Sequence, residues 1–290
     1  MNYKIYYFSP AKGVVVSSYT VSQIFSHRKT GESFSVSVDF GLGSVDVICW
    51  DDGVEFLLDG VSVRVREEHL RRLEKSDKLL FVGLRESYFL EIRDRGNYYK
   101  LKYLGEGVAP TLEINGVHMH NIVGTDPISD AERKVKLVGV DRGDRVLDIC
   151  TGLGYTAIKS LKRGARVLTI EKDENVLLLA EHNPYSRDLV QAKIILGDAF
   201  YVLDELEEES FDKIIHDPPV FAFAGELYSA EFYKKMFRVL RKGGKVFHYT
   251  GSPGKHRGIR FQRGVMRRLL SAGFSIVKII EGYGILAAKD

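Results

Sequence analysis

The pattern of hydrophobic and polar positions changes character near residue 110. Before that point, short runs alternate polar and apolar residues with the two-residue period of β-strands, and Gly, Asp and Asn separate them. The runs are KIYYF, SFSVSVDF, SVDVICW, VEFLLDG, VSVRV, SYFLEI and YYKLKYL. A helical period interrupts them in REEHLRRLEK. This pattern predicts a β-rich N-terminal domain over residues 1–108.

From residue 141 onward, apolar strands alternate with amphipathic helices. The expected strands are RVLDIC, RVLTIE, AKIILGD, DKIIHDPP, KVFHYTG, FSIVKII and YGILAAK. The expected helices are YTAIKSLKRG, ENVLLLAEHN, AFYVLDEL, SAEFYKKMFRVLRKG and FQRGVMRRLLSAG. Such alternation predicts an α/β fold in which helices cover both faces of a mostly parallel, seven-stranded sheet. Only EGYG separates the last two strands, which is too short for a parallel crossover, so we expect an antiparallel closing hairpin.

Residues 109–140 connect these two parts. Ser129 and Glu132 have the spacing of a capping box, in which the serine oxygen accepts an amide hydrogen and the glutamate reaches back to the helix start. We therefore expect a helix to begin at Ser129. His118 and His120 alternate in VHMHN and would share one face of a strand, but two histidines without a third ligand do not predict a metal site.

Composition and charge narrow the class of protein. A chain of 290 residues with 44% hydrophobic and 28% charged residues is typical of a globular protein with a sizeable core. No apolar run approaches the ~18 residues of a membrane span, and the N-terminus lacks a signal-peptide pattern, so we expect a cytoplasmic protein. Cys49 and Cys150 lie far apart and predict neither a disulfide framework nor a metal site.

Four of the expected strands end in an acid, at the edge where open parallel sheets bind their ligands. After Asp148, the turn through Gly152 and Gly154 lets the backbone approach a ligand, and the amides of the next helix can hold its negative end. Glu171 ends the second strand, where it can accept hydrogen bonds from ribose hydroxyls. Because GLGYTA also fits the dinucleotide pattern, these features alone leave a nicotinamide dinucleotide and an adenosyl group equally open.

The third and fourth strand ends favour the adenosyl group. Asp198 follows the third strand, where an acid can accept a hydrogen bond from an adenine amino group. The tripeptide Asp217-Pro218-Pro219 follows the fourth strand, next to the place where a transferred group would lie.

Together, the four acids, the glycine turn, the D-P-P tripeptide and the closing hairpin resemble the class I S-adenosylmethionine-dependent methyltransferases over roughly residues 125–290. The stretches DICTGLGYTAI, AEHNPYSRDL, HDPPVFAFAGELYSAEFYKKMFRVL and FHYTGSPGKHRG resemble more closely an archaeal group of predicted methyltransferases related to the spermidine synthase-like branch. The resemblance implies a Rossmann-like methyltransferase domain over residues 141–290 and S-adenosyl-L-methionine as the cofactor. Cys150 stands where the family's loop usually has its first glycine.

The resemblance also implies individual roles. Asp148 would orient the amino-acid end of the cofactor through the loop or a water, while Gly152 and Gly154 approach it closely. Glu171 would bind the ribose and Asp198 the adenine. The residues predicted to bind the cofactor are Asp148, Cys150, Thr151, Gly152, Gly154, Tyr155, Thr156, Glu171, Lys172, Asp198 and Ala199. Cys150 has no neighbouring base in the sequence, and we interpret it as a packing residue and not as a nucleophile.

Methyl transfer requires alignment of the acceptor with the methyl group more than covalent help from the protein. The predicted catalytic residues are Asp217, Pro218 and Pro219. In methyltransferases with a D/N-P-P-aromatic tetrad, the acid and a backbone carbonyl hold an amino group while the aromatic ring stacks on its base. Here Val220 follows Pro219 and Phe221 comes one residue later, so the motif predicts where the chemistry occurs but not the target atom.

Charge patterning suggests an acceptor. Residues 232–280 contain no Asp or Glu, while Lys and Arg recur, so a surface built from them attracts anions. Lys and Arg contacts to phosphates are the ordinary source of nucleic-acid affinity, and we expect RNA to bind this segment. The predicted substrate-binding residues are Phe221, His248, Tyr249, Lys255, Arg257, Arg260 and Arg263. For His248 and Tyr249, the sequence equally allows a structural role.

Other functions remain open at the level of sequence. The spermidine synthase-like branch suggests aminopropyl transfer, but a polyamine acceptor is cationic and needs an acidic pocket, whereas the predicted rim is basic. A methyltransferase acting on a small molecule is a second alternative. A nicotinamide-dependent oxidoreductase rests on the glycine turn alone, and a non-catalytic binding module leaves the D-P-P motif without a purpose.

Overall fold

The computed structural model describes residues 3–27, 29–219, 221, 223–251 and 255–290, with the backbone alone at 255–259. The chain forms two compact units. The first unit contains Met1–Phe8, Ile128–Glu174 and Asp188–Asp290, and the second contains Ser9–Pro127 and Asn175–Arg187. Neither unit is one continuous stretch, in contrast to the expected ranges 1–108, 109–140 and 141–290.

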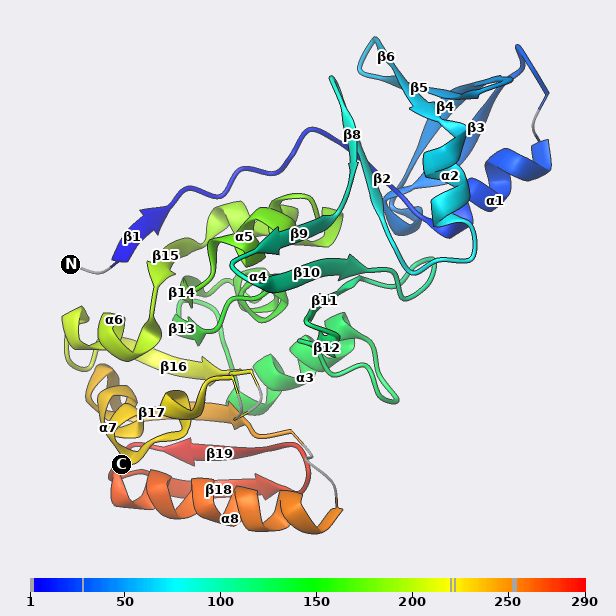
Figure 1. The fold of residues 1–290 in the computed structure, drawn as a ribbon. Helices are drawn as coiled ribbons and strands as arrows, with labels where there is room; N and C mark the ends of the chain where they lie inside the picture. The colour runs from blue at the N-terminus through cyan, green and yellow to red at the C-terminus, as the bar shows by residue number, and fades with distance from the viewer. Residues whose placement is uncertain (1–2, 28, 220, 222, 252–254) are drawn as a thin grey trace. The chain divides into compact units, whose positions relative to one another are not determined.

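The first unit is built on an eight-stranded sheet in the order β1-β15-β14-β13-β16-β17-β19-β18 (Figure 1). The strands are β1 Tyr3–Tyr6, β13 Arg145–Ile149, β14 Arg166–Glu171, β15 Lys193–Gly197, β16 Phe211–His216, β17 Leu240–Tyr249, β18 Ser275–Ile280 and β19 Gly284–Ala288. Strands β13 to β17 pair in parallel, whereas β19 pairs antiparallel with both β17 and β18. The parallel sheet and the closing hairpin are therefore present as the sequence predicts.

The expectation of seven strands was wrong by one. The first strand of the chain, β1, does not join the other N-terminal strands but pairs antiparallel with β15, with Tyr3 opposite Gly197. A side chain on Gly197 would place its Cβ 2.6 Å from Cβ of Tyr3, so the glycine admits the extra strand. An unpaired edge of a sheet is a site for further pairing, and β1 covers the edge of β15.

The helices of the first unit lie on both faces of its sheet. They are α3 Pro127–Val138, α4 Tyr155–Lys162, α6 Ala199–Glu205, α7 Ala230–Val239 and α8 Lys255–Ser271, with a short 3-10 helix at Gly225–Tyr228. Leu147 of β13 packs into a buried core with Phe232 of α7 and Leu269 of α8. The next residue of β13, Asp148, points to the opposite face, where Thr156 of α4 lies. No helix in the described part of the chain is both long and apolar enough to cross a membrane.

Helix α3 begins at Pro127, two residues before the expected start at Ser129. Proline suits the first position of a helix because the amide hydrogen that it lacks has no partner there. Glu132 does not reach back to the helix start but accepts a hydrogen bond from Arg163 at 2.7 Å. The capping-box prediction was therefore wrong in detail, although the helix itself exists.

The second unit contains three antiparallel sheets, ordered β3-β4-β5-β6, β2-β7-β8 and β12-β11-β10-β9. Its strands are β2 Gly13–Val16, β3 Ser33–Val38, β4 Gly43–Trp50, β5 Gly53–Leu58, β6 Val61–Arg66, β7 Leu80–Gly83, β8 Ser87–Phe89, β9 Glu91–Asp94, β10 Asn97–Lys102, β11 Thr111–Ile114 and β12 Val117–His118. Its helices are α1 Ser18–His27, α2 Glu67–Leu73 and most of α5 Glu174–Glu181, with 3-10 helices at Asp39–Gly41 and, in part, Pro184–Gln191.

Helix α1 was not expected from the sequence. Its residues, SYTVSQIFSH, include Thr, Val and Ile, which have low helix propensity. The helix forms nevertheless, and Val21 and Ile24 are fully buried in the core of the second unit. Packing of this apolar side of the helix therefore outweighs the local preference of the chain.

Candidate functional site

The turn between β13 and α4 is organised by a buried carboxylate. Asp148 has no exposed surface and accepts hydrogen bonds from the hydroxyls of Thr156 and Thr169, each at 2.7 Å. The hydroxyl of Thr151 in turn lies 2.6 Å from that of Thr169. Burial raises the pKa of Asp148 to about 7. Asp148 thus ties β13, β14, α4 and the turn together, and a role in orienting the cofactor through the loop remains a prediction.

Cys150 adopts a left-handed backbone conformation, with φ of 73°. This region is strained for any residue with a Cβ, which explains why a glycine usually stands at this position of the family's loop. The amides of Cys150 and Thr151 both donate to the carbonyl of Ile170, at 3.0 and 3.1 Å, and these bonds hold the strained turn against β14. Burial raises the pKa of the Cys150 thiol well above its ordinary value, so the side chain stays protonated and packs.

The two glycines of the turn have different roles. Gly152 has φ of 55°, and a Cβ built on it would meet no atom within 4 Å, so open space lies beside this part of the backbone. Gly154 has φ of 79°, and a Cβ there would lie 2.7 Å from the side chain of Leu189. Gly152 therefore leaves room for a ligand, whereas Gly154 allows close packing at the start of α4.

Glu171 at the end of β14 is only 9% exposed and is held by backbone donors. One carboxylate oxygen accepts from the amides of Lys172 and Asp173 at 2.9 and 3.0 Å, and the other accepts from Gly152 at 2.9 Å. Burial raises the pKa of Glu171, and these three bonds oppose the rise. A carboxylate has about four acceptor positions, and the described residues leave one of them on the oxygen that faces Gly152.

Asp198 follows β15, next to β14 in the sheet, and has two protein partners. One oxygen accepts from the amide of Phe200 at 2.9 Å and caps helix α6. The other lies 2.9 Å from the ammonium of Lys172, and this pairing raises the pKa of Lys172. The capping role was missed, although an aspartate directly before a helix is its usual signal.

These residues fit an adenosyl group. The structure brings Gly152, Glu171 and Asp198 to one edge of the sheet, with open space at Gly152 and an unused acceptor position on Glu171. Of the other predicted cofactor residues, Tyr155, Thr156 and Ala199 are buried in the first turns of α4 and α6. They therefore support the turn and the strand ends, and their direct contact with the cofactor stays a prediction.

Asp217, directly after β16, forms a buried ion pair that the sequence analysis missed. Its carboxylate lies 2.5 Å from the ammonium of Lys134, which is only 4% exposed and also lies 2.8 Å from Asp130. Burial opposes the charge of Lys134, but the carboxylates of Asp217 and Asp130 outweigh it and raise the pKa of Lys134. Asp130 and Lys134 have the four-residue spacing of a helical ion pair, which was the available signal.

Two tyrosines border this ion pair. The ring of Tyr249, at the end of β17, lies 4.2 Å from the Lys134 ammonium, and Tyr283 donates its hydroxyl to Asp130 at 2.9 Å. The structure therefore places Tyr249 beside the ion pair and adds Tyr283, which the sequence analysis missed. Substrate binding by Tyr249 stays a prediction. The hydroxyl of Tyr228 donates to the carbonyl of Pro219 at 2.8 Å and holds the D-P-P segment.

His248 does not lie in the site as a substrate contact. Its ring is fully buried, lies 2.9 Å from the hydroxyl of Tyr233 and stacks on His216 at 4.3 Å. Burial lowers the pKa of His248 to about 3, so the ring is neutral. The prediction that His248 binds substrate was therefore wrong, because β17 turns this side chain into the core beneath α7.

The predicted substrate residues on the loop after β16 and on α8 are exposed where they are described. Phe221 is 54% exposed, and its ring lies 5.9 Å from that of Phe261 on α8. Arg260 and Arg263 are exposed on α8. The side chains of Lys255 and Arg257, together with Val220, lie outside the described residues. Phe223, which the sequence analysis did not single out, is 50% exposed beside Phe221.

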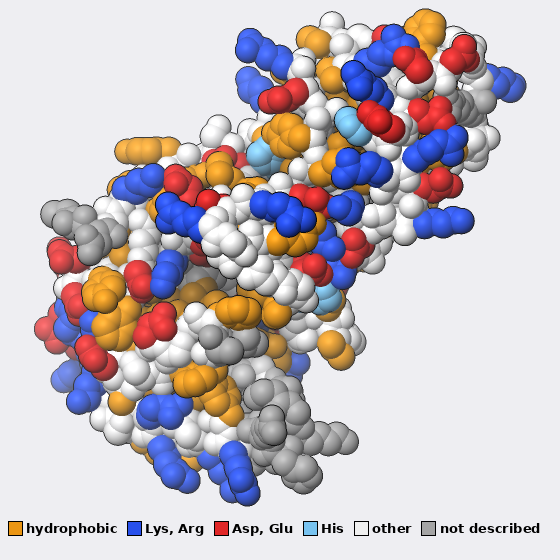
Figure 2. Space-filling model, viewed as in Figure 1, with side chains coloured by type: hydrophobic (Ala, Val, Ile, Leu, Met, Phe, Trp, Pro, Cys, Tyr) orange, Lys and Arg blue, Asp and Glu red, His pale blue; other side chains and the backbone are white. Residues whose placement is uncertain are grey.

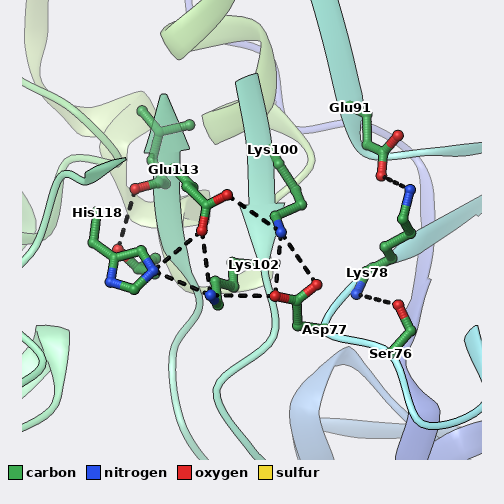
Figure 3. Close-up of polar contacts among 10 residues, drawn as sticks. Ser76, Asp77, Lys78, Glu91, Lys100, Lys102, Glu113 and His118 are labelled. Atoms are coloured by element: carbon green, nitrogen blue, oxygen red, sulfur yellow. Dashed lines mark hydrogen bonds and ion pairs between the residues drawn. The ribbon is translucent and has the colours of Figure 1, made fainter. Parts of the chain in front are cut away.

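The paired histidines of the second unit take structural roles. Figure 3 shows His118 joined to Glu113 and Lys102 in a network of ion pairs that includes Lys100. The Nε2 atom of His118 lies 3.1 Å from each of these two partners. His120 instead lies beyond the two-residue strand β12, with Nδ1 2.9 Å from the hydroxyl of Thr111. The described residues contain no group of three or more His, Cys, Asp or Glu able to hold a metal ion.

Comparison with known proteins identifies the class of fold and chemistry. A family described as "Methyltransferase domain" matches residues 146–244. The chain is 48% identical over 225 residues to an uncharacterised protein, MJ1233, of Methanocaldococcus jannaschii, and the match covers 76% of this chain and 77% of that protein. Its fold is similar to that of spermidine synthase from Thermotoga maritima, with a TM-score of 0.53, 17% identity and coverage of 71% and 76% of the two chains.

A shorter match involves a protein named for RNA. The chain is 39% identical over 87 residues to a protein of Methanocaldococcus jannaschii, MJ1653, whose name assigns it to the ribosomal RNA large subunit methyltransferases. This match covers 29% of the present chain and 23% of that protein. It is therefore a likeness between parts of two proteins.

The buried carboxylate of Asp148 makes stability depend on pH. Its pKa is about 7 in the folded chain, against an ordinary value of 3.8, so between these values the folded state holds a proton that the unfolded state has lost. The stability that this provides is fully present below about pH 4 and is lost as the pH rises to about 7. We expect the free energy of unfolding of wild type, measured relative to Asp148→Asn by denaturant titration, to fall across this range.

Asp212 at the start of β16 supplies the control. Despite its burial, hydrogen bonds from Arg145 hold the pKa of Asp212 below its ordinary value. The difference between wild type and Asp212→Asn should therefore stay level from about pH 4 to about pH 7. A level difference for Asp148→Asn as well would show that Asp148 is ionised throughout and would contradict the account of the turn.

Proposed function

Because the chain belongs to the class I S-adenosylmethionine-dependent methyltransferases, we propose that it transfers a methyl group to RNA. The observation that carries the proposal is the surface beside the D-P-P segment. There, the exposed aromatic ring of Phe221 contacts Phe261 of α8, a helix whose described exposed side chains include three arginines. This surface offers base stacking and phosphate binding together.

The cofactor side of the proposal rests on the strand ends. S-adenosyl-L-methionine, when bound, supplies an electrophilic methyl group on a positively charged sulfur. Glu171 would accept a hydrogen bond from the ribose with its remaining acceptor position, and Asp198 would lie near the adenine. The open space at Gly152 would receive the part of the cofactor nearest the backbone. The residues of this chain thus contribute position and electrostatics, and the cofactor contributes the group that is transferred.

The RNA side of the proposal rests on α8. Arg260, Arg263 and Arg267 are exposed and follow the i, i+3, i+7 spacing, so they form one stripe along the helix, which we term the arginine stripe. Figure 2 shows Lys and Arg side chains over the part of the molecule where Figure 1 draws α8. Contacts between such side chains and phosphates provide most of the affinity for nucleic acids.

The loop that follows the D-P-P segment supplies aromatic side chains. Phe221 and Phe223 are about half exposed, which is unusual for phenylalanine in a folded protein. Proteins that recognise unpaired RNA bases stack them on such rings. An RNA held by the arginine stripe can therefore present a base to Phe221, a few residues from Asp217. The name of MJ1653, which is similar to part of this chain, supports RNA as the acceptor. The likeness to spermidine synthase concerns the fold alone.

The first test removes the charge of the arginine stripe. The triple variant Arg260→Gln, Arg263→Gln, Arg267→Gln should bind cellular RNA more weakly and transfer less labelled methyl to it. For each phosphate contact that is lost, the slope of the logarithm of the binding constant against the logarithm of the salt concentration should become shallower by ~0.7–0.9, because fewer counterions are released. Filter binding over a range of salt concentrations measures both effects, and affinity for S-adenosylmethionine should not change.

The matched control neutralises three exposed basic residues at or near the amino ends of parallel strands, away from the carboxyl ends where the site lies: Arg142, Arg166 and Lys193. This variant loses the same formal charge. Equal weakening of RNA binding in both variants would therefore show that RNA is attracted by the net charge of the protein and not by the arginine stripe. Unimpaired RNA binding by the stripe variant, or a wild-type protein whose RNA binding is insensitive to salt, would remove the case for RNA and favour a small-molecule acceptor.

The second test concerns Asp217. If Asp217 positions the acceptor, Asp217→Asn should lower methyl transfer by about 100-fold, the usual consequence of a misplaced reacting group, while S-adenosylmethionine binding stays nearly unchanged. Single-turnover transfer and calorimetry separate the two quantities. Asp212→Asn, near the start of the strand whose end Asp217 follows, should leave both unchanged. Equal loss of binding and transfer would instead assign Asp217 to the cofactor.

A further inference from the structure

The ammonium of Lys134 lies in a cage of two carboxylates and an aromatic ring. Its nitrogen is 2.5 Å from Asp217, 2.8 Å from Asp130 and 4.2 Å from the centre of the Tyr249 ring. The residues of the cage come from α3 and from the ends of β16 and β17, and the lysine side chain is only 4% exposed. The cage is thus a built feature at the carboxyl edge of the sheet.

Such a cage has the chemistry of an alkylammonium site. An ammonium has three hydrogen-bond donors and no acceptor, and it binds well to carboxylates and to the face of an aromatic ring. Lys134 meets two carboxylates and one ring face, so its charge is fully compensated. The position beside the D-P-P acid where a substrate amine would be expected to bind is therefore already filled by an ammonium of the chain itself.

The charges at this position decide which acceptor it can take. Asp130 and Asp217 carry two negative charges and Lys134 one positive charge, which leaves one net negative charge. A free polyamine would have to place a second ammonium against the first or expel a buried lysine. A neutral acceptor brings no second positive charge and therefore meets no such cost. It can still donate a hydrogen bond to the second oxygen of Asp217, for which no donor is found among the described residues.

We propose that Lys134 is a specificity-determining residue that fills the amine position beside Asp217, so that the site accepts an uncharged group and excludes free alkylammonium ions. The proposal rests on the proposed function and deepens it, since the reactive atoms of nucleobases are neutral at pH 7. The residue acts through Asp217 and does not itself react. Its high pKa keeps it protonated and therefore unable to serve as a base.

The test uses 1,4-diaminobutane as the probe. Calorimetric titration into the full-length wild-type protein should give no saturable binding at millimolar concentrations. In Lys134→Ala the two carboxylates and the Tyr249 ring are vacated, and binding of the diamine should strengthen by about tenfold or more. Lys136→Ala, which removes an exposed lysine from the same helix, should behave as wild type.

A second set of variants keeps the test decisive if Lys134→Ala does not fold. Removing one partner of a buried ion pair leaves the other charges uncompensated and can destabilise a protein severely. The double variant Asp130→Asn, Lys134→Ala preserves the single net negative charge and should also gain diamine binding. Lys134→Arg preserves the positive charge and should still exclude the diamine, which a purely structural role for lysine would not require.

The outcomes separate this inference from the RNA proposal. Diamine binding to wild type as tight as to the Lys134→Ala variants, or no gain in a folded variant, would overturn the inference whatever the acceptor is. Labelled methyl transfer to RNA is measured independently in the wild-type protein. If that transfer fails while the diamine still binds only to the variants that carry Lys134→Ala, the RNA proposal fails and the exclusion of amines by Lys134 stands.

Discussion

The site depends on the hydrogen bonds that hold the Asp148 carboxylate inside the first unit. Thr156 and Thr169 donate to it from α4 and β14, so one buried group fixes the direction in which the chain leaves β13. The turn that follows is strained at Cys150, and such strain persists only where the surroundings hold the backbone in place. Because the turn is held, the amide of Gly152 reaches Glu171 on the next strand. These bonds thus fix the position of the turn and of Glu171 at one edge of the sheet.

Asp217 is a second buried carboxylate at this edge of the sheet, and it is held by a different kind of partner. Asp217 directly follows β16, the strand next to β13, and its partner is a lysine from α3 in place of hydroxyls. A buried carboxylate must be paired or protonated, and the choice of partner sets its chemistry. Burial raises the pKa of both carboxyls. The hydroxyl donors of Asp148 leave its pKa near neutrality, whereas the ammonium of Lys134 opposes the rise at Asp217 and occupies the space beside it. One edge of the sheet therefore carries two buried acids with chemically different partners.

The sequence predicted those features of the fold that depend on the residue pattern within short stretches of the chain. Four of the parallel strands are apolar runs that end in acids, and these ends meet at one edge of the sheet although the strand order there, β15-β14-β13-β16, differs from the order along the chain. The pairing of β1 with β15 was missed because an edge contact between distant segments leaves no local pattern. Lys134 was missed for a similar reason, since only the folded chain brings α3 to the end of β16. His248 was misassigned because strand alternation alone does not show which face a helix will cover.

The most direct measurement of the account is calorimetric titration of the protein with S-adenosylhomocysteine and, separately, with NAD. Wild type should bind the first and not the second. Glu171→Ala should weaken that binding by about 1–3 kcal/mol, the usual value for a hydrogen bond to a charged group. Glu174→Ala, which removes an exposed glutamate three residues further on, should have no effect. Tight binding of NAD with no binding of S-adenosylhomocysteine would contradict the assignment of the site.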